Sequence, residues 1–305
     1  MRIVSFLPAA TEICYALGLG GELVGVSPEC DYPSAVKEVP VVSRALVDSD
    51  GKTSAETSQG VGEALAEGGA LYEVDREKLE EAAPDVILTQ GLCEVCAPSV
   101  ADVRAIATRL TKKPRVVSLD PHTLKDVLEN IEAVGKACGS PVAARSVVED
   151  LRERIERVAF LTARVHERPK TACIEWLEPL FMAGHWVPEL VEFAGGIDAV
   201  AKRGERSRRI EPKDLVLAAP EVAVLMPCGF HLERTRAEAP ALTTKPWWKD
   251  LPAARANRVW LADGSAYFSR PGPRIVDGLE ILAHILHPEI FSRAPASKDA
   301  VPWMG

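Results

Sequence analysis

The sequence predicts an α/β protein of two lobes, each with a parallel central sheet, joined by one long helix. Short continuous apolar runs alternate with helical patterns along the chain, which is typical of parallel strands covered on both faces. One long segment near the middle carries only a helical pattern. The length of 305 residues suits two domains of roughly 100–200 residues each.

The first half contains five apolar runs that predict strands. The first begins at residue 2 and ends before Pro8, and the others span 23–26, 39–42, 85–89 and 115–119. Helical patterns follow Pro8 and cover 56–67, 75–83, 99–110 and 123–138. These elements define an N-terminal lobe over residues 1–140, with a polar, mobile loop expected at 43–55.

The connecting segment, residues 141–168, has no glycine and no proline after Pro141. Val148, Leu151, Ile155 and Val158 recur there at helical spacing, with charges on the other faces. A helix of about 25 residues is nearly 40 Å long. We therefore expect one long rigid helix between two lobes, the alternative being a surface helix of a single sheet.

The second half repeats the alternation. Strands are predicted at 171–176, 221–226 and 258–262, and helices at 187–194, 211–218 and 273–286. These elements define a C-terminal lobe over residues 169–290. The remaining residues, 291–305, are predicted to form a loosely ordered tail.

Composition excludes several classes of protein. Apolar residues make up 47% and charged residues 26%, which excludes intrinsic disorder. The net charge of −8 argues against binding of nucleic acid or anionic membrane through charge. No run approaches about 18 apolar residues, so we expect no membrane insertion.

The N-terminus predicts the compartment. The run that starts at Arg2 is interrupted at Pro8 and is typical of a buried strand rather than of the apolar part of a signal peptide. Seven cysteines, an odd number, do not suit a disulfide framework. Both observations favour a cytoplasmic protein.

The loops after the predicted strands hold most of the chemically interesting side chains, and ligands of parallel α/β sheets bind at the carboxyl ends of strands. Trp176, Trp186, Tyr267 and Phe268 could stack on a flat macrocycle, the alternative being ordinary packing. His185 could be a metal ligand, the alternative being a loop histidine bonded to backbone. The predicted ligand-binding residues are Pro8, Thr11, Glu12, Tyr32, Gln90, Trp176, His185, Trp186, Phe230, Tyr267, Phe268 and Arg270.

Four cysteines also lie in these loops: Cys30, Cys93, Cys96 and Cys228. The C-x-x-C spacing of Cys93 and Cys96 lets both sulfurs reach one metal, so the four thiolates could hold zinc or an iron–sulfur cluster. The alternatives are a redox pair and thiols without a special role. Cys14, Cys138 and Cys173 lie in apolar patterns and are expected in the core.

Several motifs, in order, resemble one known family. Residues 2–12 resemble its first strand, P-x-x-T-E turn and helix, and 79–87 and 211–224 resemble its paired helix-and-strand elements. Residues 187–196 are similar to its second-lobe helix that ends in two glycines, and 269–274 to the turn before its last helix. The family is that of the substrate-binding proteins of ABC importers for cobalamin, haem and ferric siderophores, and its cobalamin-binding branch is the most similar.

The resemblance implies a class III periplasmic-binding-protein-like fold and a corrinoid or other metal chelate as ligand, bound between the lobes and not transformed. It also implies an ABC permease as partner, docked through one glutamate of each lobe. Glu77 corresponds to the first glutamate, while Lys213 occupies the second position beside Asp214. The alternative function is a cytoplasmic metal- or iron–sulfur-binding protein or enzyme on the same scaffold, with the four loop cysteines as ligands.

Overall fold

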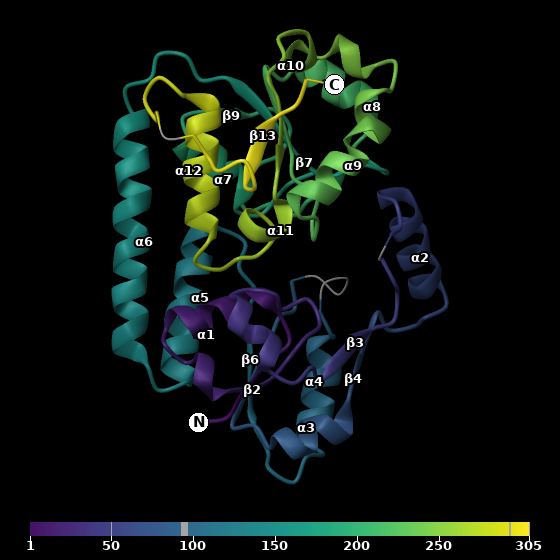
Figure 1. Ribbon diagram of the computed structural model, residues 1–305, viewed down its shortest axis with the longest axis vertical. Coiled ribbons are helices and arrows are strands. Elements are labelled where there is room, and N and C mark those ends of the chain that lie inside the picture. The colour runs from purple at the N-terminus through teal and green to yellow at the C-terminus, as the bar shows by residue number, and fades with distance from the viewer. Residues whose placement is uncertain (50, 93–96, 293, 305) are drawn as a thin grey trace. The chain divides into compact units, whose positions relative to one another are not determined.

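The chain folds into two α/β units, each with its own sheet (Figure 1). The computed structural model describes residues 1–49, 51–92, 97–292 and 294–304. The first unit comprises residues 1–52, 56–121 and 125–150. The second comprises 53–55, 122–124 and 151–305, so two short pieces of the first half of the chain belong to it.

The sheet of the first unit has the strand order β2-β1-β5-β6, and every pairing is parallel. Its strands are β1 (Ile3–Ser5), β2 (Leu23–Val26), β5 (Val86–Thr89) and β6 (Arg115–Ser118). β1 and β5 are buried throughout, as their unbroken apolar composition predicts. A separate antiparallel pair consists of β3 (Ser43–Ala45) and β4 (Tyr72–Val74).

The helices of the first unit pack around a core that includes Val4, Phe6, Leu79 and Ile87. Asp75 starts one of them by accepting a hydrogen bond from the backbone N–H of Lys78 at 3.0 Å. The helical elements are α1 (Pro8–Ala16), η1 (Gly20–Glu22), η2 (Ser34–Glu38), α2 (Ser54–Ala66), α3 (Arg76–Ala82), α4 (Val100–Ala107) and α5 (Leu124–Ala137).

The sheet of the second unit is parallel at its centre and antiparallel at its edges. Its strand order is β10-β8-β7-β11-β12-β13, with β9 paired parallel to the start of β7. The central strands are β7 (Lys170–Trp176), β11 (Val222–Leu225) and β12 (Val259–Ala262). The others are β8 (Phe181–Met182), β9 (Ile197–Asp198), β10 (Arg208–Arg209) and β13 (Ala300–Pro302).

Helices cover this sheet, whose core includes Ile174, Met182, Leu215 and Leu225. The helical elements are α7 (Val187–Phe193), α8 (Pro212–Ala218), α9 (Leu232–Thr243), η3 (Trp248–Asp250), α10 (Pro252–Arg255), α11 (Gly264–Tyr267) and α12 (Ile275–Leu286). α9 contains Pro240, and the sequence analysis missed this helix because an internal proline argues against one.

The long helix α6 (Pro141–Thr162) runs along the chain from the first unit into the second. It holds 22 residues and ends earlier than the predicted residue 168. At its end, the Thr162 hydroxyl donates to the carbonyl oxygens of Val158 and Phe193, at 3.1 and 2.7 Å. Within the second unit, Arg154 of α6 forms ion pairs with Asp277 and Glu280 of α12.

Two predicted loops are wrong in part. The tail is ordered at Ala300–Pro302, which forms β13 and pairs antiparallel with β12. Without β13, β12 would be the edge strand and its backbone groups on that side would be unpaired. The segment 43–55 includes β3 and the first turn of α2. Within the described residues, no helix is both long and apolar enough to cross a bilayer.

Candidate functional site

Each sheet carries polar and aromatic side chains beyond the carboxyl ends of its strands, and the two units are described in turn. In the first unit, a small hydroxyl and thiol cluster follows β1 and β2. The Thr11 hydroxyl donates to Ser5 Oγ at 2.9 Å and lies 3.1 Å from Cys30 Sγ, which is 3.4 Å from Ser27 Oγ. All four residues are buried.

Burial raises the pKa of the Cys30 thiol, which therefore stays protonated at neutral pH. A thiolate is the form that binds metal, so Cys30 as placed is a packed, hydrogen-bonded thiol. Cys93 and Cys96 lie outside the described residues, and Cys228, in the second unit, is half-buried. Among the residues that the structure describes, no three His, Cys, Asp or Glu side chains form a possible metal site. The four-cysteine site stays a prediction.

The other predicted ligand residues of the first unit differ in exposure. Glu12, on α1, and Gln90, after β5, are buried, and Pro8 is partly buried. Tyr32, in the loop after β2, is 47% exposed. Tyr32 is therefore the predicted residue of this unit with the most accessible ring.

In the second unit, aromatic rings follow β7 and β11. Trp176 meets Phe230 edge to face, with 5.1 Å between ring centroids. The guanidinium of Arg234 lies 3.8 Å from the centroid of the Phe230 ring. Phe230 is buried and supports the partly exposed Trp176.

Three predicted ligand residues are packed inside the second unit. Trp186, Phe230 and Phe268 are each less than 5% exposed. Trp186 Nε1 donates to the carbonyl oxygen of Phe268 at 2.9 Å. All three rings are packed in the structure, and their assignment as ligand-binding residues stays a prediction.

Tyr267 and Arg270 lie after β12. The Tyr267 hydroxyl donates to Asp299 at 2.7 Å, and the pKa of Tyr267 is raised, first by burial and then by this carboxylate. The Arg274 guanidinium is 5.8 Å from the Tyr267 ring centroid. Arg270 is almost fully buried. Tyr267 thus remains partly accessible in a fixed position.

His185 has the most unusual surroundings. Its backbone is left-handed, with φ of 55°, an uncommon conformation that histidine adopts more often than most residues other than glycine. Its ring lies 5.5 Å from the Trp186 ring, in a stacked arrangement, and 5.5 Å from the His122 ring. Nδ1 is buried with no hydrogen-bond partner among the described residues. A buried ring nitrogen without a partner is a candidate for binding a ligand.

His122 reaches this place because its segment is held to α7. The backbone N–H of Leu124 donates to the carboxylate of Glu189 at 2.8 Å, and Arg203 forms an ion pair with the same buried carboxylate. His122 is not among the predicted ligand-binding residues, and the sequence analysis missed the pair. Nothing in the local pattern around residue 122 signals it.

The carboxylate of Glu175, at the end of β7, lies beside the His185 loop. It accepts a hydrogen bond from the Ser207 hydroxyl at 2.6 Å, and burial raises its pKa. Only glycine fits at 184, since a Cβ there would meet the backbone of Arg206 and Ser207. Burial, followed by the neighbouring His122 and Arg206, lowers the pKa of His185 to about 4. The imidazole is therefore neutral at pH 7.

A second imidazole follows β11. His231 Nδ1 lies 2.9 Å from Asp263 Oδ2, and the other oxygen of Asp263 accepts from the backbone N–H of Ala266 at the start of α11. The His231 side chain is 57% exposed. His231 is not among the predicted ligand-binding residues either, and the sequence analysis did not find its carboxylate partner.

The carboxyl ends of the parallel strands carry a neutral imidazole, exposed aromatic rings and buried polar groups. These features define a small-molecule-binding protein of the α/β class. The sequence model of the periplasmic binding protein family matches residues 3–266, and the chain belongs to this family. It is thereby a substrate-binding protein of the ABC-transporter type, as the sequence analysis predicts.

The chain is similar to several curated relatives. It is 24% identical over 282 residues to the vitamin B12-binding protein of Vibrio cholerae, covering 92% of this chain and 86% of the relative. It is 24% identical over 298 residues to an uncharacterized ABC transporter substrate-binding lipoprotein, YvrC, of Bacillus subtilis, covering 95% and 81%. The predicted family is thus confirmed.

Solved structures show the same fold. The periplasmic heme-binding protein RhuT of Roseiflexus sp. RS-1 has a TM-score of 0.70 and 22% identity, over 95% of this chain and 98% of the other. The vitamin B12-binding protein BtuF of Vibrio cholerae has a TM-score of 0.68 and 22% identity, over 96% and 98%. These matches confirm the fold class. The comparisons support neither an iron–sulfur protein nor a cytoplasmic location, since these relatives are periplasmic proteins or a lipoprotein.

Proposed function

We propose that the chain binds a planar metal chelate, a corrinoid or haem, without transforming it. The placement of His185 carries this proposal. Its imidazole is neutral at pH 7, stacked on Trp186 and held on a left-handed backbone. A neutral imidazole is the usual nitrogen ligand of cobalt and iron in proteins.

The accessible aromatic rings of the second unit support a flat ligand. Trp176 and Tyr267 follow two strands of one sheet, and each is fixed by a neighbour, Phe230 and Asp299 respectively. Rings held in this way can stack on a macrocycle at a small cost in conformational entropy. The relatives named for vitamin B12 and for heme bind ligands of this shape.

Titration of the purified protein with aquocobalamin and with haemin tests the proposal. We expect a dissociation constant near or below about 1 μM for one of them. Trp176→Ala should weaken binding at least about tenfold, the effect of losing one stacked ring. Phe160→Ala, a change of an exposed ring on α6, is the matched control and should bind as the wild type does. Wild-type protein that binds neither compound at about 100 μM would refute the proposal.

The absorption spectrum distinguishes the role of His185. Replacing it with asparagine should shift the visible bands of the bound chelate, because an axial nitrogen is lost. An unchanged spectrum with unchanged affinity would exclude His185 as a ligand. Iron and acid-labile sulfide in the protein as purified would instead favour the cluster of Cys30, Cys93, Cys96 and Cys228.

We further propose an ABC permease as partner, docked through Glu77. This side chain is exposed in the first turn of α3, and Lys213 is exposed at the start of α8. With its permease co-expressed, Glu77→Arg should abolish co-purification, and Lys213→Glu should strengthen it. Equal recovery of the wild type and of Glu77→Arg would refute docking through this residue.

A further inference from the structure

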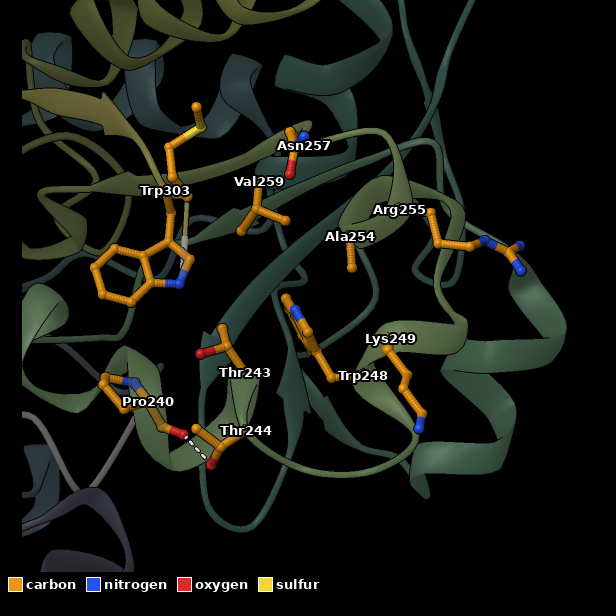
Figure 2. A pocket seen from close by; sticks show the side chains of 11 residues that line it. Pro240, Thr243, Thr244, Trp248, Lys249, Ala254, Arg255, Asn257, Val259 and Trp303 are labelled. Atoms are coloured by element: carbon orange, nitrogen blue, oxygen red, sulfur yellow. Dashed lines mark hydrogen bonds between the residues drawn. The ribbon is translucent and has the colours of Figure 1, made fainter.

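A cavity lies in the second unit, beside the first residue of β12 (Figure 2). Its volume is about 330 Å³, within the range of small-ligand sites. Val259, the first residue of β12, lines it, whereas Asp263 follows the last residue of that strand. The lining consists of Pro240, Thr243, Thr244, Trp248, Lys249, Ala254, Arg255, Asn257, Val259, Trp303 and Met304.

Two indole rings line this cavity, Trp303 on one side and Trp248 on the other (Figure 2). Trp248 is 5% exposed and packs in the core of the unit. Trp303 is fixed through its backbone N–H, which donates to the carbonyl oxygen of Val259 at 2.8 Å. An aromatic group can pack against rings that are held in this way.

The polar groups of the cavity favour a hydrogen-bond acceptor. Trp303 Nε1 is buried and has no partner within the described part of the chain. In Figure 2 it faces the interior of the cavity, and the Thr243 hydroxyl lies on the same side. The Thr244 hydroxyl proton is already used, since it donates to the carbonyl oxygen of Pro240 at 2.6 Å. An indole N–H accepts nothing, so only an acceptor on a ligand can satisfy it.

The charges at the cavity are of one sign. Lys249 and Arg255 are the charged members of the lining, both are cations, and both are exposed. Figure 2 shows their charged ends on the Trp248 side, away from Trp303. An anionic group at that end of a ligand would be attracted, while its other end meets the indole N–H.

We propose that this cavity binds a small aromatic carboxylate that carries a hydroxyl or carbonyl oxygen at the end opposite to the carboxylate. The ring packs against Trp248, the oxygen accepts from Trp303 Nε1, and the carboxylate lies towards the end of the cavity where Lys249 and Arg255 provide positive charge. Trp303 and Met304 lie beyond residues 3–266, the part matched by the family. The other nine lining residues lie within that part, at the end of β12 opposite to the proposed chelate site.

Calorimetric titration of the full chain with 4-hydroxybenzoate tests the proposal. We expect a dissociation constant below about 1 mM, and binding at least about fivefold weaker for 4-hydroxybenzyl alcohol, which lacks the charge. Absence of binding at about 5 mM, or equal affinity for the two compounds, would overturn the proposal.

Two variants assign the contacts. Trp303→Phe keeps a ring but removes the N–H, and should weaken binding about five- to tenfold. The double variant Lys249→Gln, Arg255→Gln should lower affinity by a similar factor, whereas Lys213→Gln, an exposed cation outside the lining, should not. Wild-type affinity in either cavity variant would overturn the corresponding contact. Unchanged aquocobalamin or haemin binding in all three would show that the two sites are separate.

Discussion

Acid should destabilise this protein through His185. The pKa of its imidazole falls from 6.5 to about 4 on folding, first because the ring is buried and then because His122 and Arg206 are near. A lowered pKa in the folded state means that the folded form gives up its proton more readily than the unfolded form. The contribution of the neutral ring is therefore fully present above pH 6.5 and is lost as pH falls towards 4.

The size of the effect follows from the shift. At 1.36 kcal/mol per pH unit, the full shift corresponds to about 2 kcal/mol of unfolding free energy between pH 7.5 and pH 5, and solvent screening of the half-buried ring reduces this to about 1 kcal/mol. His185→Asn removes the titration, and asparagine tolerates the left-handed backbone at this position. The difference in unfolding free energy between wild type and variant should therefore change by about 1 kcal/mol over this range.

Urea denaturation followed by circular dichroism at half-unit pH steps measures this difference. His166→Asn, a change of an exposed histidine after α6, is the matched control and should give a constant difference from wild type. A difference between wild type and His185→Asn that is equally independent of pH would refute the assignment of a neutral, buried imidazole at 185.

Two further predictions concern the second unit. The Asp198 carboxylate has one oxygen buried without a partner among the described residues, and burial raises its pKa to about 6. The stability that the protonated Asp198 contributes is lost as pH rises through 6. Asp198→Asn should therefore raise the free energy of unfolding by about 2 kcal/mol at pH 8 and leave it unchanged at pH 4. An equal increase at both pH values would contradict this prediction. Trp186→Phe leaves the Phe268 carbonyl oxygen unsatisfied and should lower the free energy of unfolding, measured by urea denaturation, by about 1–3 kcal/mol. Trp260→Phe is the control and should lower it by less, because no such hydrogen bond of the Trp260 indole is found among the described residues. Equal losses in the two variants would contradict the role of the Trp186 hydrogen bond.

The strand positions were predictable because each strand of the two sheet centres is a short apolar run. β2 lies at the predicted residues, β5, β7 and β12 differ from the prediction by one residue at one end, and β11 differs by one residue at each end. The predicted strand 39–42 is wrong, since only Val41 forms a bridge there, to Val26. The hydrophobic pattern is local, so a sequence reports it directly. The short edge strands β8, β9, β10 and β13 escaped notice because two or three residues carry no periodicity.

The candidate site was predictable in its location but not in its details. Loops after parallel strands collect ligand-binding residues in any such sheet, so the loops that contain Trp176 and His185 could be chosen from the sequence. Which rings are exposed depends on packing: Trp176 is partly accessible, whereas Trp186, Phe230 and Phe268 are covered. Burial is decided by neighbours that are distant in sequence.

By itself, the sequence determined the alternating strands and helices, the long helix near the middle of the chain and the family, because these depend on local periodicity and on the order of motifs. Only the tertiary structure brought His122 to His185, His231 to Asp263 and Trp303 to Trp248. Each pair joins residues separated by 30 or more positions, and the path of the backbone between them, not any local pattern, sets their distance.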